Sequence, residues 1–242
     1  MQVRVRTALV GGRRCRWREV GGGPPLVLVH GLAGSWRWWR PVLPTLAAER
    51  SLLLVDLPGF GGLPRMRPFD PDASVEWLAR WTQAAELGPA DIVGHSLGGL
   101  LCARLAARHP ETVRRLVLVA PAGLPGRTAV GSTAPLLRAL LSAPPRFLAL
   151  LARDAARSGP VTIGTAARAL LAADARADLA AVQARTLVLA GRTDHLIPLA
   201  DAEELARALP DGRVHVLDAG HVPMVEQPAA FSRELLGFLA AP

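Results

Sequence analysis

The residues from Gly94 to Gly98 read G-H-S-L-G and place a serine between two glycines. The pattern G-x-S-x-G is typical of a nucleophile on a sharp turn between a strand and a helix. The strand-like residues 91–93 precede it and the helix-like residues 100–107 follow it, as that turn requires. The two glycines lack a Cβ atom and leave room for a serine held in a strained backbone conformation. We therefore predict that Ser96 is a nucleophile.

Asp194 and His221 complete a candidate catalytic triad with Ser96. Each of the three follows a predicted strand, and the loops after parallel strands meet at one edge of a sheet. The order serine, aspartate, histidine is the order expected along a chain after such a turn. A serine activated by a histidine that a carboxylate orients can attack a carbonyl carbon. The spacing therefore predicts acyl chemistry through an acyl-enzyme.

The choice of base rests on where the other histidines fall. His95 is adjacent to the candidate nucleophile, and we expect its side chain to point away from the serine across the turn. His30 begins a glycine-rich loop. His109 ends a predicted helix and His215 lies within a predicted strand, where capping or solvent-facing roles are ordinary. His221 is preferred because it follows the last strand in a Gly-His loop.

The choice of acid rests on a comparison with Asp56, Asp201 and Asp218. Asp56 also ends a strand, but it precedes Leu-Pro-Gly, and an aspartate there commonly fixes a turn by hydrogen-bonding its backbone. We expect this structural role for Asp56 and the catalytic role for Asp194.

Two backbone N–H groups are placed to stabilise an oxyanion. One belongs to Leu97, the residue after the nucleophile, and the other to Leu32 in the glycine-rich loop H-G-L-A-G. Preorganised N–H donors of this kind stabilise the negative charge that develops in acyl transfer.

The elements that must position these residues alternate between strands and helices. A Gly-Gly pair between two alternating runs predicts an antiparallel hairpin at the N-terminus, and the later apolar runs are typical of strands buried on both faces. The predicted strands are 3–10, 13–20, 26–29, 51–55, 91–93, 115–120, 186–190 and 213–217, and the predicted helices are 41–49, 73–87, 100–107, 199–209 and 228–239. The pattern predicts an α/β protein with a mostly parallel twisted sheet and helices on both faces.

The alternation lapses between residues 124 and 184, where leucine-rich stretches that predict two short helices are separated by Pro144-Pro145. An insertion between strands of a regular α/β chain is most simply a lid over the site. A tryptophan cluster, residues 36–39, either lines the substrate pocket or packs a helix on the sheet. The predicted pocket residues are Trp36, Leu140, Leu141, Phe147 and Leu148.

Over nearly its whole length the chain resembles the α/β-hydrolase fold superfamily. The matching motifs are His30-Gly31, Asp56 to Gly61, Gly94 to Gly99, Gly191-x-x-Asp194-x-x-x-Pro198 and Gly220-His221. The resemblance implies a core of residues 1–123 and 185–242 with a helical lid at 124–184. It also implies hydrolysis of carboxylic esters with small or medium acyl groups, without a metal or an organic cofactor.

Other substrates fit the same triad. The alternatives are hydrolysis of lactones, hydrolysis of carbon–carbon bonds, cofactor-free peroxidation, and hydrolysis of methyl esters on a carrier protein. An arginine-rich lid would suit an acidic carrier protein. The short loop at 30–34 counts against carbon–carbon bond cleavage, because family members with that activity tend to have a longer glycine-proline loop. The alternative that is not an enzyme is a ligand receptor built on a hydrolase scaffold, which would use the pocket mainly for binding.

Composition limits the partners. The net charge is +8, but all 28 basic residues are arginines scattered without a basic run, so we expect no nucleic-acid binding. No apolar run approaches the length needed to span a bilayer, and no stable membrane association is expected. Two cysteines without metal-ligand spacing and an N-terminus without a signal-peptide pattern predict a cytoplasmic protein with reduced thiols. Oligomeric state leaves no signal in this sequence.

Overall fold

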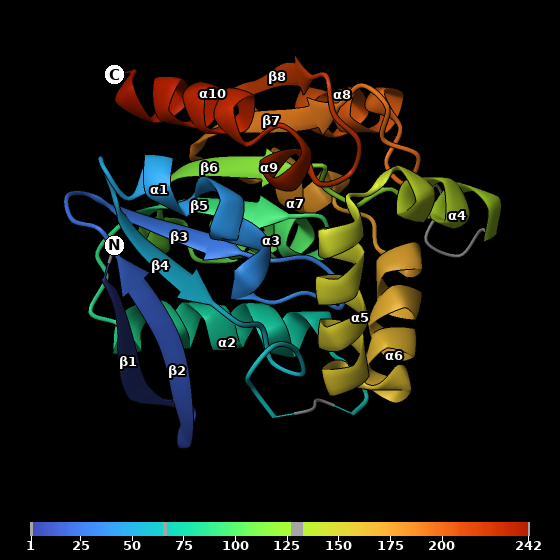
Figure 1. Cartoon of the computed structure of the whole chain (residues 1–242). Helices are drawn as coiled ribbons and strands as arrows, with labels where there is room; N and C mark the ends of the chain where they lie inside the picture. The colour runs from blue at the N-terminus through green and yellow to red at the C-terminus, as the bar shows by residue number, and fades with distance from the viewer. Residues whose placement is uncertain (1, 65–66, 127–132, 242) are drawn as a thin grey trace.

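An eight-stranded sheet runs through the molecule in the order β1-β2-β4-β3-β5-β6-β7-β8, as Figure 1 shows. The structure is a computed structural model that describes residues 2–64, 67–126 and 133–241. The strands are β1 (Val3–Val10), β2 (Arg13–Val20), β3 (Pro25–Val29), β4 (Ser51–Val55), β5 (Ala90–His95), β6 (Val113–Val119), β7 (Arg185–Gly191) and β8 (Gly212–Leu217). β3 to β8 are parallel, and β2 joins them through an antiparallel pairing with β4. This is the predicted α/β-hydrolase fold.

The antiparallel start of the sheet follows from its turn. Gly11 and Gly12 have φ values of 56° and 76°, which a two-residue hairpin turn needs and which side chains disfavour. The turn sets the register in which Val10 faces Arg13 and Val3 faces Val20. The predicted N-terminal hairpin is therefore present.

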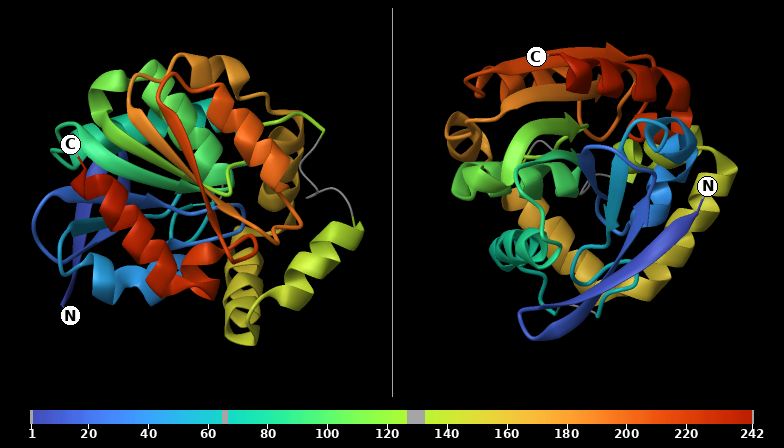
Figure 2. Two further views of the ribbon diagram at one scale, coloured as in Figure 1. Left: turned by 90° about the horizontal axis from the view of Figure 1, so that it is seen from above. Right: turned by 90° about the vertical axis from the view of Figure 1, so that its left-hand side faces the viewer.

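Helices cover both faces of the sheet, as the two views of Figure 2 show. They are η1 (Trp36–Val42), α1 (Leu43–Leu46), α2 (Pro71–Ala84), α3 (Leu97–Arg108), η2 (Pro110–Thr112), α4 (Thr133–Ser142), α5 (Pro145–Ser158), α6 (Pro160–Ala172), α7 (Arg176–Ala180), α8 (Leu199–Arg207), α9 (Pro223–Glu226) and α10 (Pro228–Ala240). Because successive side chains of a strand point to opposite faces, Val27 and Val29 belong to one core and Leu26 and Leu28 to the other. α2, α3, α7 and α8 pack on the first core, and η1, α1, α9 and α10 on the second.

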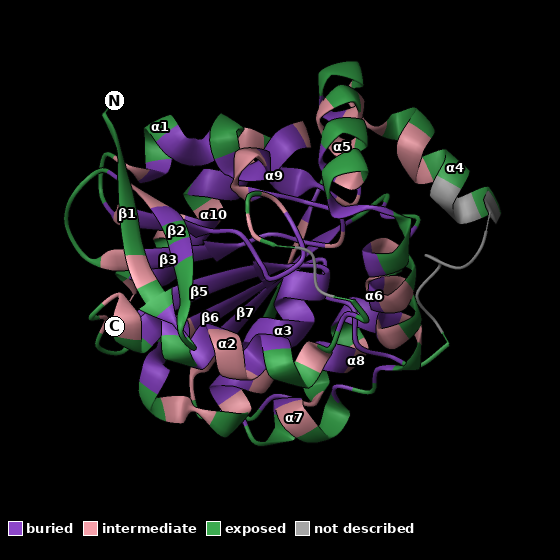
Figure 3. Ribbon diagram, turned by 90° about the horizontal axis from the view of Figure 1, so that it is seen from below, coloured by how far each residue is buried: buried purple, intermediate pink, exposed green. Residues whose placement is uncertain are grey.

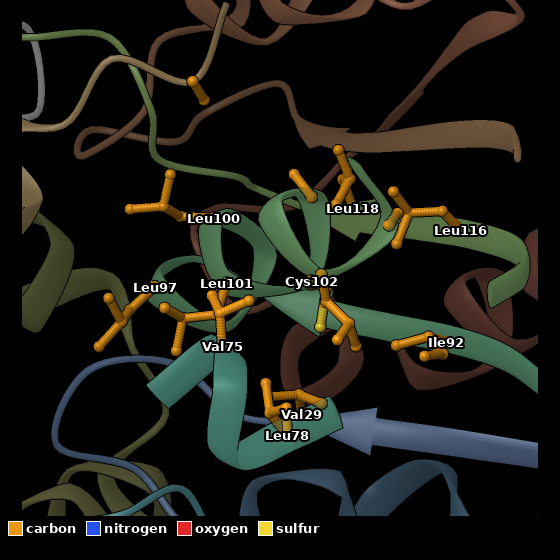
Figure 4. Close-up of a cluster of buried hydrophobic side chains, with 14 of the residues drawn as sticks. Val29, Val75, Leu78, Ile92, Leu97, Leu100, Leu101, Cys102, Leu116 and Leu118 are labelled. Carbon is orange, nitrogen blue, oxygen red and sulfur yellow. The ribbon is translucent and has the colours of Figure 1, made fainter. Parts of the chain in front are cut away.

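The central strands are buried on both faces, as Figure 3 shows by colour. Figure 4 shows the core on the α3 side, where Leu101 and Cys102 of the helix lie among Val29, Ile92 and side chains of α2 and β6. Continuous apolar runs therefore mark the central strands, whereas β1 keeps most of its side chains in solvent.

One helix differs from the prediction. The segment expected to be helical from 41 to 49 is the 3₁₀ helix η1 followed by the single-turn helix α1, and η1 includes the tryptophans. Pro41 lies inside η1 and Pro44 in α1, and a proline supplies no N–H for the backbone ladder of a longer α-helix. Ser35 caps η1 by accepting a hydrogen bond from the N–H of Arg37 at 3.3 Å.

Between β6 and β7 the chain forms α4, α5, α6 and α7, where the sequence predicted two short helices. The proline pair marks the break between α4 and α5 as expected, with Pro144 before α5 and Pro145 as its first residue. In Figure 1, α4, α5 and α6 stand beyond the carboxyl ends of the parallel strands. Residues 127–132 of the predicted lid lie outside the described residues. Among the helices that are described, none has the length and apolar character needed to cross a bilayer.

Candidate active site

Ser96 stands on the turn between β5 and α3 with φ 53° and ψ −114°. A positive φ is costly for a residue with a side chain and persists only where the surroundings hold it. Here the N–H of Ser96 donates to the carbonyl of Val119 at 2.9 Å, and its own carbonyl accepts from Leu100 at 3.1 Å. The strand and the helix together hold the serine in the strained conformation that the G-x-S-x-G pattern predicts.

The two glycines of the turn are required by close backbone contacts. A Cβ atom on Gly94 would lie 2.5 Å from the carbonyl oxygen of Gly98 and 2.9 Å from Sγ of Cys102. A Cβ atom on Gly98 would overlap the carbonyl oxygen of His30. Any larger residue would push α3 away from β3 and β5, and Ser96 would move with it.

Asp194 orients His221 through a 2.8 Å hydrogen bond between Oδ2 and Nδ1. Its Oδ1 accepts from the N–H groups of Leu196 at 2.7 Å and Ile197 at 2.9 Å. Burial by itself would raise the pKa of Asp194, but the charge of His221 and these hydrogen bonds outweigh it and lower the pKa. The carboxylate therefore accepts a hydrogen bond from Nδ1–H of His221, and Nε2 of the ring remains free to take a proton.

Glu226 holds the loop that carries His221. Its two carboxylate oxygens accept from the N–H groups of Gly220 at 2.6 Å and Val222 at 3.1 Å, on either side of the histidine. Glu226 was not among the site residues predicted from the sequence. A glutamate shortly after the Gly-His pair is the only sequence signal, and the packing of α9 is needed to interpret it.

His95 packs against the loop that carries His221, a contact that the sequence did not predict. It is fully buried, and its Nε2 donates to the backbone carbonyl of His221 at 2.8 Å. The two imidazole rings lie 4.9 Å apart. Burial, followed by the neighbouring charge of His221, lowers the pKa of His95 to about 3, so its ring is neutral. The prediction considered only the local turn and not the His221 loop that packs against it.

His30 holds the glycine-rich loop in place. Its Nε2 accepts from the N–H of Leu57 at 3.0 Å, so its Nδ1 carries the proton and donates to the carbonyl of Gly31 at 2.8 Å. Burial lowers the pKa of His30. Leu32 then lines the cavity beside Ser96. Leu97 is the first residue of α3, and the first N–H groups of a helix have no acceptor within it.

Asp56 braces a neighbouring turn. Its carboxylate accepts from the N–H of Trp36 at 2.8 Å and from the N–H of Gly62 at 2.9 Å, and Arg18 approaches to 3.7 Å. These contacts are the turn-fixing role expected for Asp56, and they engage both of its oxygens.

Ser96 and His221 line one cavity of about 300 Å³ that α4, α5 and α6 cover. The cavity walls are Leu32, Ala33, Trp38, His95, Ser96, Ala139, Leu140, Ala143, Phe147, Leu151, Ile163, Ala167, Leu196, His221, Val222 and Glu226. Of the predicted pocket residues, Leu140 and Phe147 are in the wall, whereas Trp36, Leu141 and Leu148 are not. Leu141 is 76% exposed. Trp38 takes the place expected for Trp36, whose ring instead lies under the guanidinium of Arg18.

A buried contact ties α5 to the glycine-rich loop. Asp154 is fully buried, and its Oδ2 accepts a hydrogen bond from Oγ of Ser35 at 2.6 Å. Ser35 also caps η1, so one hydroxyl links the helical cover to the segment that carries Leu32. The helices above the cavity are therefore positioned relative to Ser96 by a specific polar contact as well as by apolar packing.

Within the described ranges, no group of three or more histidine, cysteine, aspartate or glutamate side chains is arranged to hold a metal ion. The cavity walls include a serine and an imidazole that a carboxylate orients. Such a set can carry out acyl transfer through a covalent intermediate.

Comparisons with known proteins agree with this fold. A family model described as "Alpha/beta hydrolase family" matches residues 26–234. The chain is 32% identical to a 2-hydroxy-6-oxo-2,4-heptadienoate hydrolase of Pseudomonas putida, over 98% of this chain and 96% of the relative. It is also 32% identical to a pimeloyl-[acyl-carrier protein] methyl ester esterase of Aeromonas hydrophila, over 87% and 93% respectively. The crystal structure of a hydrolase from Pseudomonas aeruginosa superposes with a TM-score of 0.84 at 26% identity and covers 98% of each chain.

Proposed function

This chain belongs to the alpha/beta hydrolase family, and from that premise we propose that it is a serine hydrolase of carboxylic esters. Ser96 is the nucleophile, His221 the base and Asp194 the acid. The observation that carries the proposal is the 2.8 Å hydrogen bond between Asp194 and His221 at a cavity that Ser96 also lines. The similar proteins support hydrolysis as the reaction class, and the cavity supports the choice of substrate.

In the acylation step, Oγ of Ser96 attacks the ester carbonyl carbon while Nε2 of His221 accepts the hydroxyl proton. Asp194 holds the Nδ1 proton of His221 and stabilises the imidazolium that forms. The N–H groups of Leu32 and Leu97 donate to the carbonyl oxygen as it becomes negatively charged. His221 then gives the proton to the departing alcohol, and the acyl group remains on Ser96.

In the deacylation step, His221 takes a proton from a water molecule whose oxygen attacks the acyl carbon. The tetrahedral intermediate uses the same two N–H donors. Its collapse releases the acid and returns the proton to Oγ of Ser96. The helices α4, α5 and α6 act as a lid that shields the acyl group from bulk water during both steps.

The cavity favours an uncharged, apolar acyl group of small or medium size. Its described walls are mainly aliphatic and aromatic, they include no arginine, and their carboxylate belongs to Glu226. A dienoate such as the one in the name of the Pseudomonas putida relative carries a negative charge, for which the walls of the catalytic cavity itself offer no arginine. This argument favours esters over carbon–carbon bond cleavage of charged dienoates.

A second candidate is the hydrolysis of esters carried on an acidic partner, as the name of the Aeromonas hydrophila relative describes for a carrier protein. The observation in its favour is a set of arginines on η1 and α5 that line a cavity adjoining the catalytic one. A receptor on a hydrolase scaffold is less well supported, because a receptor has no use for an oriented base at a strained serine.

Hydrolysis of p-nitrophenyl esters from acetate to decanoate tests the proposal, together with labelling by a serine-reactive phosphonate. We expect turnover by the natural chain, stoichiometric labelling of Ser96, and a loss of turnover in Ser96→Ala of about a millionfold. Urea unfolding of both proteins shows whether the substitution leaves the fold intact. Substantial turnover by folded Ser96→Ala would overturn the assignment, and turnover-free phosphonate binding would favour the receptor.

A further inference from the structure

A second cavity of about 510 Å³ opens next to the catalytic one. Its walls are Arg37, Trp38, Arg40, Pro41, Arg146, Phe147, Leu150 and Val225, from η1, α5 and α9. Trp38 and Phe147 also line the catalytic cavity. We call this second cavity the arginine groove.

Trp38 and Phe147 form the wall that the two cavities share. Their rings are 4.9 Å apart in an edge-to-face arrangement, and Trp38 also lies 5.8 Å from the ring of His95. The indole N–H of Trp38 is buried and finds no acceptor among the described residues. The two cavities are therefore adjacent at this pair of rings.

The arginine groove carries a positive charge that its own surroundings do not neutralise. In the part of the chain that is described, no carboxylate lies within ion-pair distance of Arg37, Arg40 or Arg146. Burial first, and then repulsion from Arg153, lowers the pKa of Arg37, although Asp154 and Asp56 act in the opposite sense. Backbone N–H groups engage both oxygens of Asp56, whereas Asp154 accepts from Ser35 through Oδ2 and its Oδ1 has no hydrogen-bond partner among the described residues.

Resting on the proposed ester hydrolysis, we propose that the arginine groove binds a phosphate group on the alcohol side of the substrate. The acyl group then occupies the apolar end of the catalytic cavity, beside Leu140 and Ile163, with the ester carbonyl at Ser96. The alcohol part runs past Trp38 and Phe147 and places its phosphate among Arg37, Arg40 and Arg146.

Phosphate fits this groove better than a carboxylate does. Guanidinium groups donate in a planar fork that matches phosphate oxygens, and phosphate offers enough oxygens and charge for several arginines at once. Two of these arginines follow one another at i and i+3 on η1, and the third comes from α5, so they approach a common space from two elements.

The test compares two soluble esters that differ only in phosphate, hexanoyl glycerol and hexanoyl glycerol 3-phosphate. For the natural chain we expect a lower KM for the phosphate ester and a similar kcat for both. Replacing Arg37, Arg40 and Arg146 together with glutamine should raise the KM of the phosphate ester on the order of tenfold and leave the neutral ester unchanged. Arg207→Gln on α8 is the matched control, because Arg207 is exposed and lies outside the groove.

Ionic strength provides a second readout. Salt screens exposed charges because it shortens the Debye length. The KM advantage of the phosphate ester should therefore shrink when salt is raised from about 0.02 to 0.5 M, while the KM of the neutral ester is unaffected. Equal KM values for the two esters in the natural chain would overturn this inference and leave the ester hydrolase proposal standing. Failure to hydrolyse either ester would instead count against the proposed function itself.

The source of the phosphate is resolved by presenting it in two forms. The monomeric hexanoyl ester represents a soluble phosphate-bearing alcohol, and phosphatidylcholine vesicles containing long-chain acyl glycerol 3-phosphate represent a lipid headgroup. Turnover of the monomer alone assigns the groove to soluble esters, and faster turnover on vesicles assigns it to lipids. Either result supports phosphate recognition, provided that the triple glutamine variant loses the effect.

Discussion

His95 donates a hydrogen bond from Nε2 to the backbone carbonyl of His221 at 2.8 Å. The residue before the candidate nucleophile thus holds the loop that carries the candidate base, although the two are 126 positions apart in the chain. Because this bond joins β5 to the loop after β8, it sets the position of the imidazole relative to Ser96. His95 is therefore a positioning residue.

Removing the donor of His95 should reduce turnover with little change in KM. His95→Phe keeps a planar ring but cannot donate to His221, and a base displaced by about 1 Å can cost on the order of a hundredfold in rate. His95→Gln can still donate through its amide and should recover part of the activity. Steady-state kinetics of both variants measure this, and His215→Phe, at a half-buried histidine in β8, is the control. Equal kcat values in His95→Phe and the natural chain would contradict the positioning role.

His95 should also make stability depend on pH. Its pKa of about 3 in the folded chain lies below the ordinary histidine value of 6.5, so the unfolded chain binds more protons between these values. Stability is therefore complete above about 6.5 and declines as pH falls toward 3. His95→Gln does not titrate, and its free energy of unfolding should decline less over this range. Urea unfolding from pH 7.5 to 4 compares the two slopes, and identical slopes would rule out the buried neutral histidine.

Asp194→Asn should reduce turnover, whereas Asp56→Asn should reduce stability. In Asp194→Asn the amide oxygen can keep the bonds to Leu196 and Ile197, but the amide nitrogen then faces Nδ1 of His221 and favours the wrong tautomer. We expect a loss in kcat of about ten-thousandfold with the fold retained. Asp56→Asn leaves one backbone donor unpaired and should lower the free energy of unfolding by about 1–3 kcal/mol. Kinetics and urea unfolding of both variants would reveal an exchange of these phenotypes, which would move the acid to Asp56.

Glu226→Gln should impair catalysis without touching the triad. Both carboxylate oxygens accept backbone N–H groups, and an amide can replace only one of them while its NH₂ group opposes the other donor. We expect kcat to fall and the free energy of unfolding to decrease by about 1–3 kcal/mol. Glu234→Gln on α10 is the control, since its partners are the more exposed Arg233 and His215. If the two substitutions had equal effects on kcat, the bracing of the His221 loop would be irrelevant to turnover.

The large apolar side chains of α4 and α5 should separate into two groups by their effect on acyl-length preference. Leu140→Ala and Phe147→Ala remove walls of the catalytic cavity and should shift the acyl-length preference toward longer chains. Leu141→Ala changes a side chain that is 76% exposed, and Leu148→Ala a side chain outside the wall, so both should preserve the preference. Hydrolysis rates from acetate to decanoate give the profile of each variant. An unchanged profile in Leu140→Ala and Phe147→Ala would mean that the acyl pocket is built by other walls.

Local patterns were enough to predict the sheet. Apolar runs such as Leu26 to Val29 bury both faces wherever they pack, and Gly11-Gly12 closes a hairpin through its own backbone preference. The turn at Ser96 was equally predictable, because its glycines and its flanking strand and helix are adjacent in sequence. The meeting of Ser96, Asp194 and His221 at one edge of the sheet then followed from how parallel strands present their loops.

The relationships between distant loops were not predictable from these patterns. Whether His95 points toward His221, whether Trp36 or Trp38 reaches the cavity, and which of Leu140 and Leu141 faces inward depend on the packing of one element against another. A shift of one residue along η1 or α4 changes the side that a side chain faces, and prolines altered η1 in a way that periodicity did not reveal. The sequence by itself determined which groups are candidates for the chemistry, and the tertiary structure alone decided their neighbours, because contacts between elements depend on packing that no local pattern encodes.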